Sequence, residues 1–268
     1  MENHRQREEG NIIYPVYSRR SGGLSVGVNL FPDKKRCNFD CPYCEVFPFE
    51  RDAGFDIETM KSGLEKVLAA AGAQNNAVKD ICFSGNGEPT LSPCFPAALE
   101  AAALIRQVRA PQAELVVITN GTGLLRDETF DLLREAASGP MALDIWLKLD
   151  AGTGFWYKAI DRSAVPFERL TGKIRDFARI APVTIQTMLC TVNQSPPSRD
   201  EAAAWLSLAL ELAGTGNIRK FQIYGKARPA PLDPLASALP VSFLEERAAA
   251  LREALETAGL TAAVEVYP

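Results

Sequence analysis

Short β-rich runs alternate with helical stretches along almost the whole chain, and this alternation limits the fold more than any other feature. The strand-like runs are expected at 24–31, 79–84, 114–119, 143–150, 182–191, 218–225 and 263–267. Runs rich in Ala, Leu, Glu and Arg predict helices at 57–71, 94–108, 126–137, 166–180, 199–213 and 241–258. Six βα units and a short last strand predict an α/β fold with a parallel sheet and right-handed crossovers. A partial (β/α)6 barrel and an open doubly wound sheet both fit this pattern.

The length and composition of the chain fit a single folded domain. The chain has 268 residues, of which 47% are apolar and 23% are charged, and this is enough to bury a full core. We expect residues 1–23 to form an N-terminal extension and residues 24–268 to form the core domain. The proline-rich run 227–234 predicts a loop or lid beside the last strands.

The sequence carries no signal for export or membrane insertion. It opens with the charged run Met1–Glu9 and contains no apolar run of about 18 residues. Its six cysteines have no paired framework, which suits a reducing compartment. We therefore expect a cytoplasmic protein without disulfides and without membrane contacts.

The charge balance gives no general attraction for nucleic acid. Lys and Arg number 29 and Asp and Glu number 33, which gives a net charge of −4. Short basic clusters occur at 19–20, 34–36 and 219–220, and at Lys226 and Arg228. Such clusters are more typical of solvated loops than of a binding surface.

Polar side chains recur at every second position of several predicted strands, so each set shares one face of its strand. The sets are Ser25, Gly27 and Asn29; Cys82 and Ser84; Asp144, Trp146, Lys148 and Asp150; Thr184, Gln186, Met188 and Cys190; and Lys220, Gln222 and Tyr224. The opposite faces are apolar and are expected to meet the helices. A barrel interior with a purely structural role is filled by branched apolar residues, so these polar faces predict a lumen that holds a large polar ligand.

Three closely spaced cysteines, Cys37, Cys41 and Cys44, follow the first predicted core strand. Cysteine thiolates are the usual ligands of iron–sulfur clusters, and a cube held by four of them has no free coordination site. Three ligands leave one iron open, so the spacing predicts a cluster that can bind a substrate. In parallel barrels the active site lies at the C-terminal ends of the strands, where this loop begins.

Zinc is the first alternative, because closely spaced cysteines also form tetrahedral zinc sites. The one histidine, His4, lies in the polar N-terminal tail, and Cys82, Cys94 and Cys190 are scattered singly. The chain therefore offers no second CxxC pair to complete a structural zinc site. The ferredoxin run C-x2-C-x2-C-x3-C differs in both the order and the number of its cysteines. These comparisons favour the open iron–sulfur site.

The run Cys37–Cys44, with Tyr43 just before the third cysteine, resembles the CxxxCxxC loop of the radical S-adenosylmethionine (SAM) superfamily, which holds a [4Fe-4S] cluster. The segments 22–30, 83–90, 146–153 and 264–267 extend the resemblance to a bacterial and archaeal group that is labelled as Fe–S oxidoreductases or as similar to wyosine-tRNA synthases. The resemblance implies an α/β fold of the partial (β/α)6 radical SAM barrel type, with a short additional C-terminal strand.

The resemblance also implies a binding site for S-adenosyl-L-methionine. Gly85, Asn86, Gly87 and Glu88 occupy the place of the family's Gly-Gly-Glu motif, which contacts the amino group of SAM. Glycines allow close approach of the backbone, whereas Asn86 departs from the motif and its role stays open. The other candidates lie at or near strand ends or beside the cluster: Tyr43 near the adenine, Asn120 near the SAM site, Lys148 and Asp150 at the carboxylate and ribose of SAM, and Gln186 and Tyr224 near SAM or the substrate.

Each of these residues also has a purely structural interpretation. The run Gly85–Glu88 can be an ordinary βα turn, Asn120 can be a turn residue, and Lys148 can form an ion pair with Asp150 or Asp144. Tyr224 can be a half-buried aromatic residue with a paired hydroxyl, and Gln186 a buried amide that bonds a neighbour. Cys190, at the end of a strand, is a weak candidate for donating a hydrogen atom to a radical. An inert buried thiol is the alternative for Cys190 and the favoured interpretation of Cys82 and Cys94.

The resemblance implies an enzyme that reductively cleaves SAM at the cluster, which gives a 5′-deoxyadenosyl radical that modifies a small molecule or RNA. A one-electron reductant such as a flavodoxin or ferredoxin is the implied partner. Two alternatives stay open: an activase that installs a glycyl radical on a partner protein, and a non-enzymatic iron–sulfur electron-transfer or sensor protein. The second alternative needs a fourth protein ligand such as Cys94.

Overall fold

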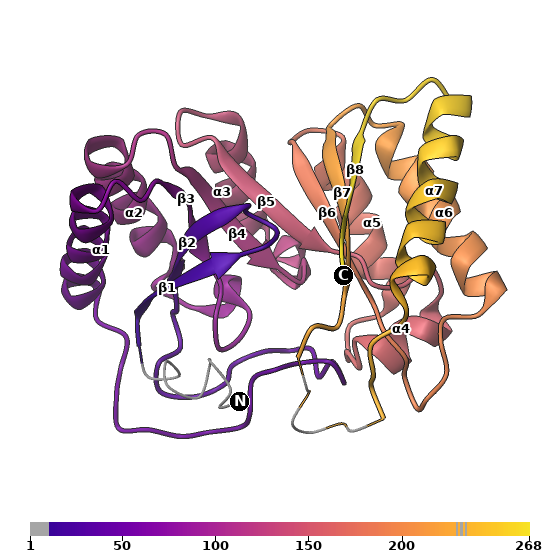
Figure 1. The fold of residues 1–268 in the computed structure, drawn as a ribbon, viewed down its shortest axis with the longest axis horizontal. Coiled ribbons are helices and arrows are strands. Elements are labelled where there is room, and N and C mark those ends of the chain that lie inside the picture. Colours follow the sequence, from indigo (N-terminus) through magenta and orange to yellow (C-terminus); the bar gives the residue numbers. More distant parts are fainter. Residues whose placement is uncertain (1–10, 229, 231–232, 234) are drawn as a thin grey trace. The chain divides into compact units, whose positions relative to one another are not determined.

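The structure, a computed structural model, describes residues 11–228, 230, 233 and 235–268. His4 and the first ten residues of the predicted extension lie outside the described residues, as do Pro229, Pro231, Leu232 and Pro234 of the predicted lid. The chain forms two compact units (Figure 1). The first unit contains the chain up to Cys37, Pro48–Thr119 and Glu135–Ile145; the second contains Asn38–Phe47, Asn120–Arg134 and Trp146–Pro268.

In the first unit, an antiparallel hairpin leads into a parallel sheet. β1 (Ile13–Ser18) pairs with β2 (Gly23–Val28), which pairs in parallel with β3 (Val78–Phe83), and β3 pairs in parallel with β4 (Glu114–Thr119). The connections contain α1 (Ile57–Ala73), the short 3-10 helix η1 (Pro89–Leu91) and α2 (Phe95–Arg109). α1 begins where the Asp56 carboxylate accepts a hydrogen bond from the Thr59 N–H, which satisfies a donor that the first turn leaves unpaired.

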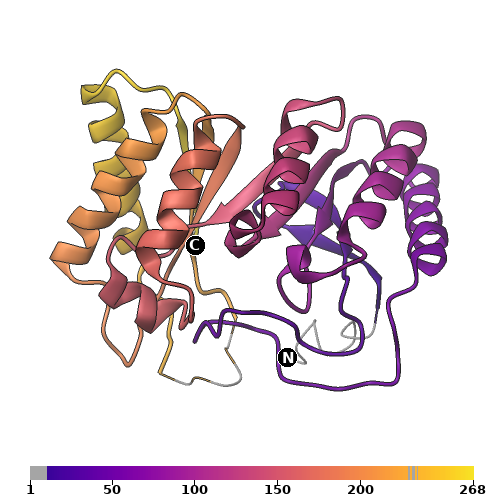
Figure 2. The same cartoon turned by 180° about the vertical axis from the view of Figure 1, so that it is seen from behind.

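In the second unit, four parallel strands carry helices on one face. α3 (Asp127–Ser138) and β5 (Leu143–Lys148) contribute residues to both units. The parallel pairs run from β5 to β6 (Val183–Leu189), from β6 to β7 (Ile218–Gly225) and from β7 to β8 (Ala263–Tyr267). The remaining elements are η2 (Thr122–Leu125), α4 (Gly154–Ile160), α5 (Phe167–Ala178), α6 (Arg199–Ala213) and α7 (Val241–Thr257). Figures 1 and 2 show α6 and α7 lying along one face of β6, β7 and β8.

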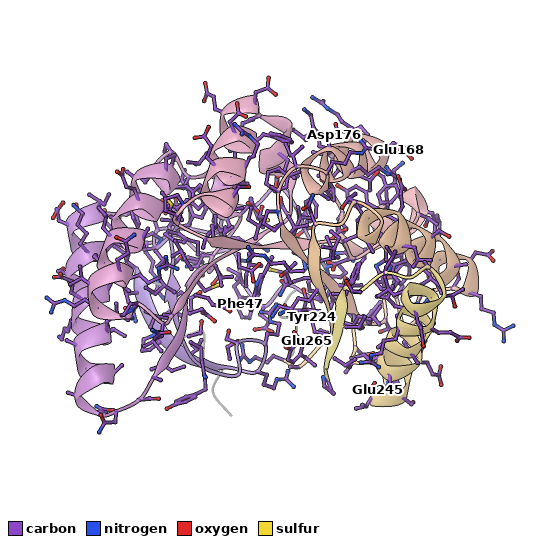
Figure 3. All side chains as sticks on the ribbon, turned by 90° about the horizontal axis from the view of Figure 1, so that it is seen from above. Phe47, Glu168, Asp176, Tyr224, Glu245 and Glu265 are labelled. Carbon is purple, nitrogen blue, oxygen red and sulfur yellow. The ribbon has the colours of Figure 1, made fainter. Side chains whose placement is uncertain are left out.

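Strand register in the second unit separates an apolar face from a polar one. Leu147, Ile185, Phe221 and Val264 stand opposite one another across β5 to β8, and so do Lys148, Gln186, Gln222 and Glu265. The apolar row faces the helices: on α6, Trp205 donates its indole N–H to the Leu149 carbonyl, 3.1 Å away. Figure 3 labels Tyr224 and Glu265, which lie on the polar face of β7 and β8. The shared polar face predicted for Lys148, Gln186 and Gln222 is confirmed.

The elements differ from the sequence prediction at two places. All seven predicted strands and all six predicted helices are present, with boundaries shifted by at most a few residues. β1 was not predicted, because Pro15 interrupts its alternation; proline is tolerated there because β1 is an edge strand in the described sheet. α4 was not predicted either, because its sequence is too short to show a helical period. The predicted end of the N-terminal extension at residue 23 lies where β2 begins.

Candidate functional site

The cysteine loop begins in the first unit, where the backbone before Cys37 lies against Gly87. The Arg36 N–H donates to the Asn86 carbonyl at 3.0 Å, and the Glu88 N–H donates to the Arg36 carbonyl at 2.9 Å. A Cβ on Gly87 would lie 1.8 Å from the Arg36 carbonyl oxygen. Only glycine allows this approach, so Gly87 fixes the residue that precedes the first cysteine.

Asn86 and Gly85 fasten the same turn to the end of β2. The Asn86 side-chain amide donates to the Phe31 carbonyl at 3.0 Å, and its backbone N–H donates to Asn29 Oδ1 at 3.2 Å. Gly85 has a φ of 125°, and a Cβ there would lie 2.7 Å from Asn29 Oδ1. The sequence left the role of Asn86 open; in the structure its side chain joins the turn to the segment after β2.

Glu88 is buried and caps a short helix. Its Oε1 accepts hydrogen bonds from the Thr90 N–H at 3.1 Å, the Thr90 hydroxyl at 2.6 Å and the Thr119 hydroxyl at 2.7 Å. The carboxylate therefore ties the start of η1 to the end of β4. Contact of Glu88, Gly85, Asn86 or Gly87 with SAM stays a prediction.

In the second unit, Asn120 lies against the cysteine loop. Its side-chain amide donates to Asn38 Oδ1 at 2.8 Å, and its Oδ1 accepts from the Thr122 N–H at 3.0 Å. The Asn38 amide in turn donates to the Thr122 hydroxyl at 2.7 Å. Asn120 is thus a turn residue, as its structural interpretation predicted, and it also holds the residue that follows Cys37.

Cys41 and Cys44 lie in one turn of the second unit, where the Cys44 N–H donates to the Cys41 carbonyl at 3.0 Å. Cys41 Sγ lies 3.8 Å from Asp161 Oδ1 and donates its thiol proton to it. Burial and the nearby Asp161 raise the pKa of Cys41 well above its usual value. Burial and Asp150 likewise raise the pKa of Asp161 well above that of an exposed carboxyl. Cluster binding at Cys41 therefore has to displace a proton.

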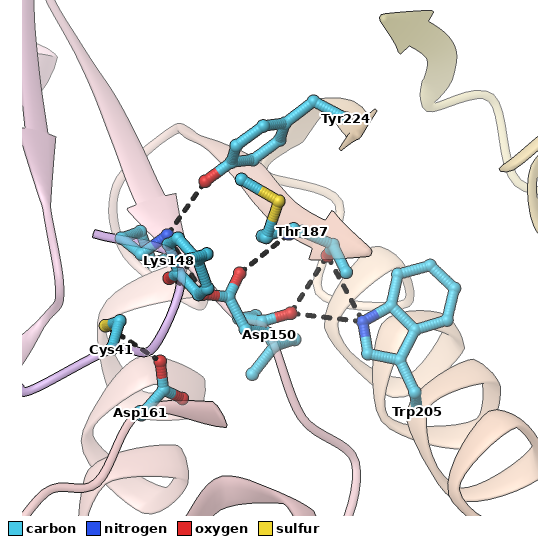
Figure 4. A network of polar contacts seen from close by, with 10 residues as sticks. Cys41, Lys148, Asp150, Asp161, Thr187, Trp205 and Tyr224 are labelled. Atoms are coloured by element: carbon cyan, nitrogen blue, oxygen red, sulfur yellow. Dashed lines mark hydrogen bonds and ion pairs between the residues drawn. The ribbon is translucent and has the colours of Figure 1, made fainter. Parts of the chain in front are cut away.

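Tyr43 joins the cysteine loop to a buried charge pair, shown in Figure 4. Its hydroxyl donates to Asp150 Oδ2, and the Lys148 ammonium lies 2.9 Å from the same oxygen. Asp150 Oδ1 accepts from the Met188 N–H at 2.8 Å. Lys148 also donates to the Tyr224 hydroxyl at 2.8 Å and lies over the Tyr43 ring, 4.9 Å from its centroid.

Electrostatics favours a charged lysine in this network. Burial is the largest single influence on Lys148 and lowers its pKa, but Asp150 and the other acidic groups around it together raise that pKa well above its usual value. Burial and Asp150 raise the pKa of Tyr43, so its phenol stays protonated and donates. The side chain of Asp150 is 0% exposed, whereas that of Lys148 is 14% exposed. Lys148 is therefore the member of the pair that an added ligand can reach.

The remaining candidates are Gln186 on β6, Tyr224 on β7 and Cys190, which follows β6. The Gln186 amide donates to Gln222 Oε1 at 2.7 Å, which agrees with the structural interpretation of Gln186. Tyr224 is half-buried with a paired hydroxyl, also as that interpretation predicted. Cys190 is 0% exposed, and burial raises its pKa to about 12. A role of Cys190 as a hydrogen-atom donor stays a prediction.

The donor set of the cysteine loop has the chemistry of an iron–sulfur site. None of Cys37, Cys41 and Cys44 is in a disulfide. Cys37 belongs to the first unit and the other two to the second. Among the described residues, no three His, Cys, Asp or Glu side chains lie close enough together to hold a metal ion. The three-cysteine cluster site is therefore a proposal that rests on donor chemistry.

A family model described as the Radical SAM superfamily matches residues 33–187, a segment that contains the cysteine loop, β3 to β5 and most of β6. This chain belongs to the radical SAM superfamily. The superfamily uses a [4Fe-4S] cluster and S-adenosylmethionine. No helix in the described part of the chain combines the length and apolar character needed to cross a membrane.

Two curated relatives, both named UPF0026 protein, come from two strains of Helicobacter pylori. One is 30% identical over 178 residues and the other 31% over 172 residues. The matches cover 63% and 61% of this chain and 51% and 49% of the relatives, so the chain spans about half the length of the curated relatives it matches.

Solved radical SAM structures share the fold at low identity. Streptococcus suis SuiB bound to the precursor peptide SuiA matches with a TM-score of 0.65 and 14% identity, over 92% of this chain and 50% of SuiB. A radical SAM methyltransferase from Sphaerobacter thermophilus matches with a TM-score of 0.64 and 16% identity, over 94% of this chain and 68% of the methyltransferase. The predicted α/β fold of the radical SAM barrel class is confirmed.

Sequence reasoning missed Asn38, Thr122 and Asp161, which all contact the cysteine loop. Asn38 lies between Cys37 and Cys41, and Thr122 lies two residues after Asn120. Their polar side chains at these positions could have indicated that they contact the loop. Asp161 had no such signal, because it lies 120 residues after Cys41 at the end of a helix that the sequence did not predict.

Proposed function

We propose that this chain cleaves S-adenosylmethionine reductively at a [4Fe-4S] cluster ligated by Cys37, Cys41 and Cys44, and that it uses the resulting radical to modify a substrate. The observation that carries the proposal is the loop itself: three cysteines outside any disulfide, in a CxxxCxxC spacing, inside the segment that the radical SAM family model matches. When bound, the cluster supplies the electron that splits SAM into methionine and a 5′-deoxyadenosyl radical.

Lys148 is the proposed contact for the carboxylate of SAM. Its ammonium is held by Asp150 and the Tyr224 hydroxyl, yet its side chain remains partly exposed. A carboxylate arriving there meets a lysine that is already oriented, so little side-chain entropy is lost on binding. Asp150 and Tyr43 keep this lysine beside the cysteine loop.

The first-unit turn is proposed to bind the methionine end of SAM. Gly85, Asn86, Gly87 and Glu88 hold the backbone on both sides of the turn in place. Glu88 is the proposed partner of the SAM amino group, since a carboxylate favours a cationic donor. Asn120, Gln186 and Tyr224 are proposed to reach SAM or substrate from the second unit, and Cys190 to donate a hydrogen atom.

The substrate is proposed to be a small molecule or RNA, as in the family group that the sequence resembles. The alternative is an activase that acts on a protein; it is kept because one protein of the same fold was solved with a precursor peptide bound. A one-electron reductant such as a flavodoxin or ferredoxin is the proposed partner.

The test is SAM cleavage by the anaerobically reconstituted protein. Wild type, Cys41→Ala and Cys94→Ala are incubated with dithionite and SAM, and methionine and 5′-deoxyadenosine are measured by mass spectrometry alongside bound iron. Cys94 is the matched control, because it is a free cysteine that makes no side-chain capping bond at the start of α2. We expect both products from wild type and Cys94→Ala and neither from Cys41→Ala. Iron lost in Cys94→Ala, or products formed by Cys41→Ala, would refute the ligand assignment.

The RNA substrate and the protein substrate can be distinguished by which macromolecule stays bound to the protein during purification. Native isolation under anaerobic conditions, followed by sequencing of bound RNA and mass spectrometry of bound protein, distinguishes the two proposals. Enrichment of a defined RNA supports the modification enzyme, and a stoichiometric large protein containing a glycyl radical site supports the activase.

A further inference from the structure

The C-terminal end of α4 contacts the cysteine loop at three consecutive loop residues, all within the second unit. The Phe39 ring packs edge-on against the Tyr157 ring, with centroids 5.8 Å apart. The Asp40 N–H donates to the Asp161 carbonyl at 3.0 Å, and the Cys41 thiol donates to Asp161 Oδ1 at 3.8 Å (Figure 4). One end of one short helix therefore supports the segment that leads into Cys41.

We propose that Asp161 is a positioning residue for Cys41, and that its side chain tunes the electronic properties of the cluster that Cys41 ligates. This inference rests on the proposed function, because it takes Cys41 to be a cluster ligand. Asp161 acts through Cys41 and is not itself a ligand.

The two contacts of Asp161 can be separated chemically. Its backbone carbonyl holds the Asp40 N–H whatever side chain stands at position 161. Its carboxyl contacts the sulfur of Cys41, and it also interacts with the Asp150 carboxyl, which is not part of the loop. Truncating the side chain therefore removes the contact to sulfur and leaves the backbone contact in place.

The burial of the Asp161 side chain requires compensating contacts. Asp161 is only 3% exposed, and a buried carboxyl is unfavourable unless its partners compensate. Capping of α4 does not require it, because the cap is made by the Asp161 backbone N–H to the Tyr157 carbonyl. An alanine at this position would lose the contact with Cys41 and the interaction with Asp150.

The helix end is also fixed from its other side. Arg162 follows with a φ of 48°, a left-handed conformation that disfavours residues other than glycine. Its guanidinium forms an ion pair with Asp233, 2.5 Å away. Because the backbone of this end is held by contacts outside the cysteine loop, Asp161 variants are expected to keep its position.

Hydrogen bonds and dipoles next to a cluster thiolate set the reduction potential of the cluster and its orientation in the protein. A carboxyl placed against the Cys41 sulfur is such a group. Its removal should change both the midpoint potential and the electron paramagnetic resonance (EPR) spectrum of the reduced cluster, and these are quantities that a purely structural residue leaves unchanged.

The experiment compares wild type, Asp161→Ala, Asp161→Asn and a control, Glu201→Gln, each as the full chain reconstituted anaerobically. Glu201 is a buried carboxyl that binds the opposite end of α4, accepting from the Gly152 N–H and the Thr153 hydroxyl at 2.5 Å each. Bound iron, the midpoint potential from an EPR-monitored titration and the EPR line shape are measured for all four proteins.

We expect Asp161→Ala to shift the midpoint potential beyond the spread of replicate titrations and to change the line shape. Asp161→Asn, which keeps a polar group beside the sulfur, should lie between alanine and wild type. Glu201→Gln should match wild type in both measurements, although it replaces a buried carboxyl of α6 that contacts the start of α4.

Wild-type potential and line shape in Asp161→Ala with full iron would overturn the inference. If circular dichroism shows that Asp161→Ala is unfolded, the test uses Asp161→Asn and Asp161→Glu instead. A wild-type midpoint potential and line shape in both variants would overturn the inference. Absence of a cluster in wild type would instead defeat the proposed function, so the two failures are distinguishable.

Discussion

The substitution Gly87→Ala tests how the start of the cysteine loop is held. The added Cβ would lie 1.8 Å from the Arg36 carbonyl oxygen, and because the atom it meets is backbone, no side-chain rotation relieves the clash. The two hydrogen bonds between Arg36 and the turn, of 3.0 and 2.9 Å, have to lengthen or break. At about 1 kcal/mol for each backbone hydrogen bond, the expected loss is about 2 kcal/mol.

Amide hydrogen exchange reports this loss at the two donors themselves. A local opening made easier by about 2 kcal/mol speeds exchange of the Arg36 and Glu88 amides by roughly 30-fold, since about 1.4 kcal/mol corresponds to a factor of ten. Gly72→Ala is the matched control in the same unit, because a Cβ there meets nothing within 4 Å and alanine favours a helix. Wild-type protection of both amides in Gly87→Ala would refute this account of the loop.

Three further substitutions test other parts of the structure. Burial raises the pKa of Asp80 in the folded protein above the unfolded value of 3.8. The protonated carboxyl therefore stabilises the fold at low pH, and this stabilisation is lost as the pH rises through the folded-state pKa. Asp80→Asn should therefore unfold at a higher temperature than wild type at pH 7, with the difference vanishing below pH 4 in thermal scans. Asn38→Ala loses its bonds to Asn120 and should weaken the exposed loop by about 1 kcal/mol, seen as lower iron content after reconstitution. Arg228→Ala breaks an exposed ion pair with Glu45 of 2.9 Å, and a double-mutant cycle with Glu45→Ala should give a coupling energy below about 1 kcal/mol.

The order of strands and helices could be predicted from the sequence because β2 to β8 and the longer helices each show a regular repeat of apolar residues. Apolar residues of α1 recur at Met60, Leu64 and Leu68, and all three are buried. β1 and α4 could not be found in this way, since one is interrupted by Pro15 and the other has too few residues for a pattern.

The candidate site was predicted unevenly for the same reason. The spacing of Cys37, Cys41 and Cys44 is local, so it could be recognised directly. The contacts that hold the loop are not local: Arg36 forms an isolated parallel bridge with Gly87, and Asp161 contacts Cys41 across 120 residues. No spacing rule connects these residues, and only the fold brings them together.

Several residues that were expected to bind SAM also hold the cysteine loop, and this decides how their variants have to be interpreted. Asp150 has a fully buried side chain that accepts from the Tyr43 hydroxyl, and Lys148 is its ion-pair partner. Replacing Asp150 disturbs the turn between Cys41 and Cys44 before any effect on SAM is considered. A variant that loses SAM binding but keeps its iron identifies a contact of SAM, whereas one that loses both identifies a support of the loop. Lys148, with a side chain that is still partly exposed, is the residue for which the first result is expected.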